Sequence, residues 1–93
     1  MKLPVDYTKL SIGEKRIIRE QYIKEQNGLC MYCKSPLNEN PPKWIMEKKI
    51  TPRLYPEGFF QHPIHLQHCH KTGMTEGAVH NYCNAVLWEY EYR

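Results

Sequence analysis

The stretch Ile64–Cys83, "IHLQHCHKTGMTEGAVHNYC", holds four of the chain's five histidines and two of its four cysteines. Imidazole and thiolate groups are the side chains that bind borderline-soft metal ions best. The two remaining cysteines, Cys30 and Cys33, also stand close together in the sequence. The crowding therefore indicates a metal site first and catalysis second.

The chain has 93 residues, which gives room for one domain over residues 1–93. A chain this short buries too little apolar surface to be comfortably stable on its core alone. Its four cysteines could add stability as two disulfides or as one metal site. The N-terminal "MKLPVDYTKL" lacks the apolar run of a secretion signal, and no stretch approaches the roughly 20 apolar residues of a membrane span. We therefore expect an intracellular protein, neither secreted nor in a membrane, in a reducing setting that disfavours disulfides.

The first half of the chain carries a clear helix signal. Ser11 followed by Glu14 is a capping box, and Ile18 and Tyr22 lie one turn apart on the same helix face. These residues predict a helix over about residues 12–26, which Asn27 and Gly28 end.

The second half predicts a hairpin and a helix. Residues 38–60 are rich in proline, lysine and aromatic residues, and we interpret them as a loop. Residues 64–68 and 76–79 suit two strands around a tight turn, and residues 81–93 suit a closing helix. Together with a cysteine knuckle at residues 30–33, the order of elements is helix, knuckle, loop, hairpin and helix. This order predicts a small α+β fold.

Two cysteine-containing pairs have the spacing of a structural zinc site. Cys30 and Cys33 form C-x2-C, and His80 and Cys83 form H-x2-C, which together give a Cys3His set typical of tetrahedral zinc. Four protein ligands leave no open position for water, so this zinc stabilises the fold and is not the catalyst. The alternative is a group of buried thiols with a solvent-facing histidine.

A second group of polar residues remains beside the zinc ligands. His65, Gln67, His68 and His70 fall together, which is too many polar and titratable groups for a strand that only packs. Asn84 directly follows the last zinc ligand. On a helix its side chain points about 100° away from that ligand, so one helix start can serve two sites.

Three segments of the chain carry a resemblance. "EQNGLCMYC", "IHLQHCHKTG" and "EGAVHNYCN" resemble, in order and spacing, the three blocks of the HNH nucleases, and more closely the phage recombination endonuclease VII branch. The resemblance spans about residues 27–84. It implies a ββα-metal (His-Me finger) fold over about residues 64–92, with a preceding helix and one structural zinc site. It also implies cleavage of DNA phosphodiesters with one divalent ion, inside a bacterial or phage-infected cell.

The same resemblance assigns roles to the second group. His68 falls on the general base and Asn84 on a ligand of the catalytic metal. His65 and His70 fall on flanking histidines, which we place at the scissile phosphate. Gln67 falls where the family has the aspartate that holds the catalytic ion.

The chain departs from the family pattern at three positions. His80 replaces the third zinc cysteine, which zinc tolerates. Cys69 replaces a second aspartate, and Gln67 replaces the metal-binding one. The chain's single aspartate, Asp6, is too remote in sequence to be nominated as a substitute.

These departures affect the expected metal. We keep Gln67 as a metal ligand and expect Mg²⁺ or Mn²⁺. Imidazole from His65 or His70 could compensate for the missing carboxylate and would favour Mn²⁺, Co²⁺ or Ni²⁺.

DNA contacts are expected from basic residues, because phosphates attract cations. The candidates are Lys43, Lys48, Lys49, Arg53 and Lys71. We expect Trp44 and the pair Phe59-Phe60 in the core rather than on DNA. We also expect Trp88, Tyr90 and Tyr92 of the last helix to pack against the first helix, whose Lys15, Arg16, Arg19 and Lys24 we interpret as a solvated face.

The first functional interpretation is an HNH endonuclease that nicks or cuts double-stranded DNA. The second is a zinc-stapled DNA-binding module whose nuclease centre has decayed, and Gln67 is its basis. The retention of His68, His70 and Asn84 argues against decay. A third is a structural zinc knuckle that binds protein. A monomer and a weak dimer are both compatible with the sequence.

Overall fold

Helix α1 spans Ile12–Glu25 in the computed structural model, which describes residues 2–91. Both halves of the predicted capping box are present. The Glu14 N–H donates to the Ser11 hydroxyl at 3.1 Å, and the Ser11 N–H donates to the Glu14 carboxylate at 2.9 Å. Ile18 and Tyr22 are the buried residues of the helix, so the predicted core face is confirmed.

Strand β1, Ile64–His68, pairs antiparallel with β2, Thr75–His80, and α3, Asn81–Glu91, follows without an intervening residue. The predicted strands are therefore confirmed, with β2 longer by one residue at each end. The pairing is regular as far as Gln67, which lies opposite Gly77, and then passes over Glu76 so that His68 lies opposite Thr75. Such an irregularity bends the strand and re-aims the side chains beside it.

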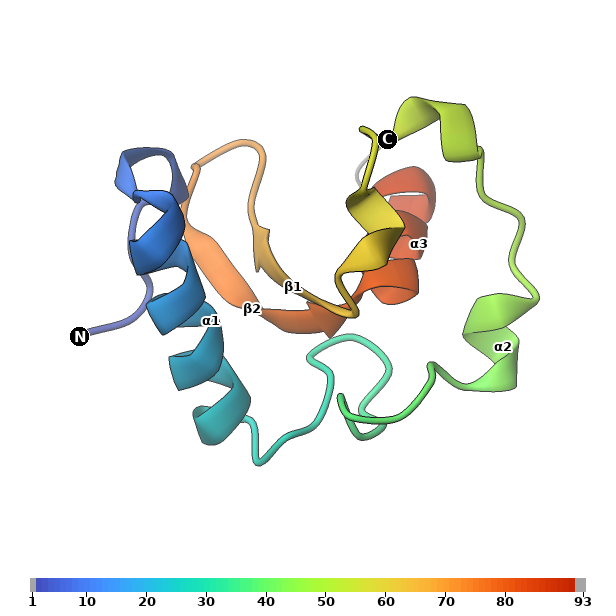
Figure 1. The fold of residues 1–93 in the computed structure, drawn as a ribbon, viewed down its shortest axis with the longest axis horizontal. Coiled ribbons are helices and arrows are strands. Elements are labelled where there is room, and N and C mark those ends of the chain that lie inside the picture. The colour runs from blue at the N-terminus through green and yellow to red at the C-terminus, as the bar shows by residue number, and fades with distance from the viewer. Residues whose placement is uncertain (1, 92–93) are drawn as a thin grey trace.

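The hairpin lies between the first and last helices, with α1 on one side and α3 on the other (Figure 1). This arrangement contradicts the prediction that aromatic residues of the last helix pack against α1. Trp88 makes an edge contact with Tyr55 at 5.9 Å between ring centroids, and the Tyr90 hydroxyl donates to the Lys49 carbonyl at 2.6 Å. Tyr92 and Arg93 lie outside the described residues.

The segment predicted as a loop over residues 38–60 contains short helical turns. Helix α2 spans Lys43–Met46, and 3-10 turns η2 and η3 span Pro52–Leu54 and Phe59–Gln61. Ile45 is 1% exposed and anchors α2 in the core, whereas Trp44 is 49% exposed. The prediction that Trp44 belongs to the core is therefore wrong, because its neighbour fills that place.

The N-terminal segment lies against the hairpin turn. Val5 and Thr75 exchange hydrogen bonds, from the Val5 N–H to the Thr75 hydroxyl at 3.0 Å and from the Thr75 N–H to the Val5 carbonyl at 2.8 Å. The Tyr7 N–H donates to the Gly73 carbonyl at 2.8 Å. These bonds place 3-10 turn η1, Tyr7–Lys9, beside the end of β1. Asp6 shares this position, but its carboxylate accepts from Thr8.

Gln26 joins the end of α1 to β2. Its amide oxygen accepts from the Ala78 N–H at 2.9 Å, and its amide nitrogen donates to the Ala78 and Leu29 carbonyls at 2.9 and 2.7 Å. Gly77 leaves room for this contact, since a Cβ there would lie 2.7 Å from the Gln26 oxygen and 2.8 Å from the Met31 sulfur.

We predict that Gly77→Ala lowers the free energy of unfolding by about 1–3 kcal/mol, because the added methyl group displaces a hydrogen-bonded amide. Denaturant titration followed by circular dichroism measures this change. Gly13→Ala is the matched control: it lies in a helix, and apart from its chain neighbours and the backbone of that helix no atom lies within 4 Å of the added Cβ. The control should keep or raise the stability by up to about 1 kcal/mol. Equal stability of the two variants would contradict the role of Gln26.

Candidate functional site

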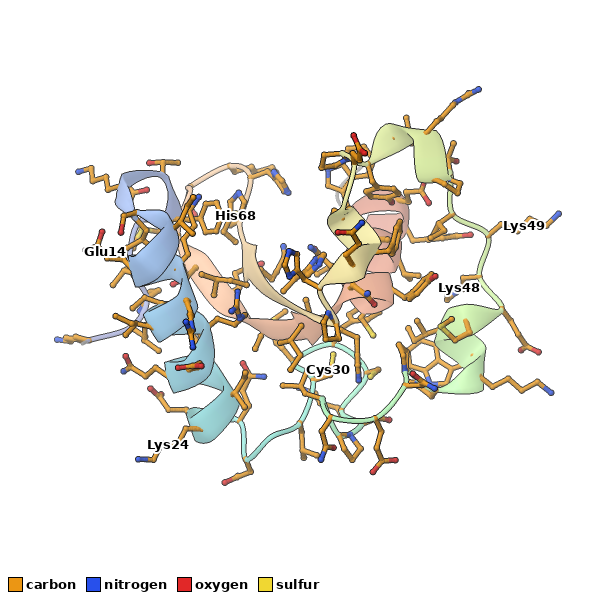
Figure 2. All side chains as sticks on the ribbon, viewed as in Figure 1. Glu14, Lys24, Cys30, Lys48, Lys49 and His68 are labelled. Carbon is orange, nitrogen blue, oxygen red and sulfur yellow. The ribbon has the colours of Figure 1, made fainter. Side chains whose placement is uncertain are left out.

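The four predicted zinc ligands lie together. Cys30 and Cys33 come from the knuckle after α1, His80 ends β2, and Cys83 lies in the first turn of α3. Their ligand atoms all lie within 4.8 Å of one another. All but the half-buried Cys33 are buried, so the alternative of a solvent-facing histidine is excluded. Figure 2 shows Cys30 directly beneath the junction of β2 and α3.

The knuckle is closed by backbone hydrogen bonds. The Cys30 N–H donates to the Ser35 carbonyl at 2.8 Å, and the Lys34 N–H donates back to the Cys30 carbonyl at 3.0 Å. Lys34 adopts φ 66°, a left-handed conformation that turns the chain sharply just after Cys33.

His80 is oriented to offer a metal its Nδ1 atom. Its Nε2 lies 2.9 Å from two carbonyl oxygens, those of Pro36 and Glu39, so Nε2 carries the proton. Nδ1 then has a free lone pair, 3.4 Å from the Cys33 sulfur and 3.5 Å from the Cys83 sulfur. Tetrahedral zinc with ordinary Zn–S and Zn–N distances separates such atoms by about 3.6 Å. The geometry therefore fits zinc, and the two carbonyls supply the outer-shell contact typical of metal-bound histidine.

Without a metal, one sulfur of the coupled pair Cys30 and Cys83 carries the negative charge, and the hydrogen bond between them raises the pKa of the Cys83 thiol. A hydrogen bond from the Cys83 thiol, together with backbone N–H groups, lowers the pKa of Cys30 to about 4 although burial opposes this. Thiolate is the form of cysteine that binds zinc. Cys30, Cys33, His80 and Cys83 can thus hold a zinc ion.

The second group of predicted residues lines one open cleft of about 810 Å³. The cleft lies over β1, with α1 on one wall and residues 54–59 on the other. Of the predicted residues, those it brings together are His65, Gln67, His68, His70 and Asn84. Outside the Cys3His cluster, residues 2–91 contain no further compact group of three histidine, cysteine or acidic ligand atoms. Any metal in the cleft would therefore depend on amides as well as imidazole.

His65 and Asn84 join the hairpin to α3 inside this cleft. The Asn84 amide nitrogen lies 3.0 Å from His65 Nδ1, and His65 Nε2 lies 2.8 Å from the Phe59 carbonyl. Burial of the imidazole lowers the pKa of His65, so the ring is neutral at pH 7. Asn84 thus points into the cleft while its neighbour Cys83 points to the zinc cluster, as the helix geometry predicted.

His68 stacks on an aromatic ring from the N-terminal segment. The Tyr7 and His68 rings are 3.9 Å apart and inclined by 9°, and the His70 ring lies 4.8 Å from His68. Burial lowers the pKa of His68, and the nearby His70 and Lys15 lower it further. In Figure 2, His68 lies beside the upper end of α1, well apart from Cys30. No sequence pattern indicated Tyr7, which lies about sixty residues away from His68 in the chain.

Gln67 is 3% exposed, and its amide is held by its own hairpin. The amide nitrogen donates to the His68 carbonyl at 2.8 Å and to the Glu76 carboxylate at 3.3 Å. Cys69 lies in the turn, where hydrogen bonds from Thr72 lower the pKa of its thiol.

None of the predicted DNA-binding residues lines the cleft. These residues are Lys43, Lys48, Lys49, Arg53 and Lys71. Lys43 pairs with Glu47 at 3.8 Å, and the Lys48 ammonium lies 5.0 Å from the centre of the Tyr90 ring. Figure 2 shows Lys48 and Lys49 on the side of the molecule away from His68.

Two other basic residues, Lys15 and Arg19, line the cleft instead. Both are half-buried, so the interpretation of the first helix as a fully solvated face is wrong for them. Their spacing of four residues places them on one helix face, which was the available sequence signal. The expected core place of Phe59 is also corrected, because it lines the cleft and packs edge-on against His65 at 4.6 Å.

Comparisons with protein-family models, with curated proteins and with solved structures returned no match. Within residues 2–91, none of the helices has both the length and the apolar character needed to cross a membrane. The chemistry of the two sites therefore has to be argued from their own geometry.

We predict one tightly bound zinc per chain, measured by elemental analysis of the purified protein. His80→Cys should retain it, because Nδ1 and a cysteine sulfur reach similarly far from the backbone. Cys83→Ala should lose the zinc and unfold, since small metal sites contribute much of the folding energy. Protein that stays folded after complete removal of zinc by a chelator would contradict this.

Proposed function

We propose that the protein is a divalent-metal-dependent HNH endonuclease that hydrolyses DNA phosphodiesters at a ββα-metal centre. The observation that carries this proposal is that β1 supplies His65 and His68, and α3 supplies Asn84, to one and the same cleft. The adjoining Cys3His cluster supports it, because it gives so small a chain a means of fixing the hairpin relative to the helix.

His68 suits the role of general base. Its lowered pKa keeps the imidazole neutral at pH 7, so a ring nitrogen can take a proton from an attacking water. The nearly parallel Tyr7 ring restricts its rotation. The His70 ring, whose centroid lies 4.8 Å from that of His68, would hold the phosphate.

The cation would be held by neutral donors. Asn84 offers an amide oxygen, and the second protein ligand is Gln67 or His65. A divalent cation there would neutralise phosphate charge and stabilise the leaving oxygen. Amide and imidazole donors fit Mn²⁺ or Ni²⁺ better than Mg²⁺, which depends most on carboxylates.

DNA would enter along α1. Lys15 and Arg19 line the wall of the cleft beside β1, and Arg19 offers the forked donors that bind phosphate best. We therefore assign the phosphate contacts near the reacting bond to these two residues, in place of the five predicted from the sequence, Lys43, Lys48, Lys49, Arg53 and Lys71.

A decayed, DNA-binding module is the second candidate. The absence of a carboxylate at Gln67 favours it, since the family's aspartate is what binds the catalytic ion. Binding of DNA without cleavage under Mg²⁺, Mn²⁺ or Ni²⁺ would identify this second function.

We predict that wild type nicks or cuts supercoiled plasmid with Mn²⁺, and that His68→Ala lowers the rate at least about a hundredfold. The variant should keep its zinc, its circular dichroism spectrum and its DNA affinity, because the base acts in the reaction and not in binding. Gel analysis of plasmid topology measures the rate. Undiminished cleavage by His68→Ala would remove this residue from its role.

We predict that Arg19→Ala weakens binding of a double-stranded oligonucleotide. The slope of log affinity against log salt concentration should fall by about one, because one phosphate contact is lost. Arg53→Ala is the matched control, because this exposed arginine lies outside the cleft, and it should bind almost as wild type does. Fluorescence anisotropy over a range of salt concentrations measures both. The opposite ranking of the two variants would place the DNA on the α2 side.

A further inference from the structure

We propose, on the basis of the endonuclease function proposed above, that His65 replaces Gln67 as the partner of Asn84 in binding the catalytic cation. We further infer that this neutral pair binds the cation firmly only when a DNA phosphate lies in the cleft.

The hydrogen bonds of His65 repeat those of the zinc-facing His80. His65 Nε2 donates to the Phe59 carbonyl at 2.8 Å, as His80 Nε2 donates to the Pro36 carbonyl at 2.9 Å. In both rings Nδ1 therefore keeps its lone pair. A carbonyl that holds the distal nitrogen of an imidazole is the usual outer-shell contact of a metal-bound histidine. The environment of His65 thus selects the tautomer that a metal requires.

The spacing of the two donor groups fits one ion. When no cation is bound, the Asn84 amide N–H donates a hydrogen bond to the lone pair of His65 Nδ1 at 3.0 Å. Half a turn of the amide would bring its oxygen to that position. Two neighbouring ligands of an octahedral cation are about 3.0 Å apart when each lies about 2.1 Å from the ion. A cation can therefore take over the contact with little movement of α3 or β1.

Gln67 is less available to the cation. Its amide nitrogen donates to the His68 carbonyl and the Glu76 carboxylate, so turning the amide would break both bonds. Its burial at 3% exposure leaves little room to turn. We assign Gln67 to fixing the end of β1 against the bulge at Glu76 of β2, beside His68.

The charge of the cleft explains the need for DNA. His65 and Asn84 contribute no negative charge, and the cations Lys15 and Arg19 line the same cleft, with Glu57 as its one acidic residue among those described. A dication is therefore repelled until an anionic phosphate arrives. By linkage, DNA raises the affinity for the metal by the same factor as the metal raises the affinity for DNA.

The first test follows Mn²⁺ binding by electron paramagnetic resonance in zinc-loaded His68→Ala protein, which holds DNA without cutting it. With a double-stranded oligonucleotide, Mn²⁺ should bind at least roughly tenfold more tightly than to the protein alone or to the DNA alone. Spin-echo modulation should show a histidine nitrogen bound to manganese. Equal affinity with and without DNA would overturn the dependence on phosphate.

The second test identifies the nitrogen. In the same background, His65→Gln should remove the nitrogen signal and weaken Mn²⁺ binding roughly tenfold or more. His70→Gln and Gln67→Leu should keep the signal, with zinc content and circular dichroism reporting the fold of each variant. If the nitrogen signal survives in His65→Gln and wild type still cleaves plasmid, the assignment of His65 is overturned but the endonuclease function is not. Absence of both cleavage and DNA-dependent Mn²⁺ binding in wild type would instead overturn the endonuclease function itself.

Discussion

The convergence of three sulfurs and one imidazole nitrogen is the constraint on which the rest of this structure depends. Lone pairs crowded within 4.8 Å repel one another unless a cation lies between them. The four residues come from the knuckle after α1, the end of β2 and the start of α3, so one ion would join these three parts of the chain. For a chain of 93 residues, such a link adds stability that a larger domain would draw from a larger apolar core.

The second site derives its geometry from the first. The first turn of α3 directs Cys83 to the cluster and Asn84 to the cleft, so a helix start fixed by the cluster also fixes the amide that meets His65 at 3.0 Å. All five residues of β1 line that cleft. The irregularity after Gln67 turns His68 toward the Tyr7 ring. Structural and chemical roles are therefore separated between adjacent residues.

The sequence predicted the parts of this arrangement that depend on local spacing. A capping box, a C-x2-C knuckle, an alternating strand and two side chains on one helix turn each involve residues within a few positions of one another. The order of these local signals was also enough to predict the four zinc ligands and the five cleft residues named from the resemblance, which the structure brings together.

The contacts that were missed or misplaced join distant parts of the chain. Tyr7 reaches His68, and the Pro36 and Glu39 carbonyls reach His80, through folding that no local pattern shows. The sequence predicts Lys15 and Arg19 to be ordinary surface cations, because only the fold shows that the hairpin lies beside α1. Trp44 was misjudged because its apolar size suggested burial, whereas Ile45 beside it takes the core position.

The central claim is that one bound zinc fixes both sites through the start of α3. Nitrogen-15 spectra of the histidine rings test it directly, because they report tautomer and metal ligation for each ring. With one equivalent of zinc, His80 should show a protonated Nε2 and a metal-bound Nδ1, and His65 a protonated Nε2. Removal of zinc should abolish both signatures together. A His65 ring that keeps its tautomer in zinc-free protein, or a His80 ring protonated at Nδ1 in the zinc-loaded one, would contradict the claim.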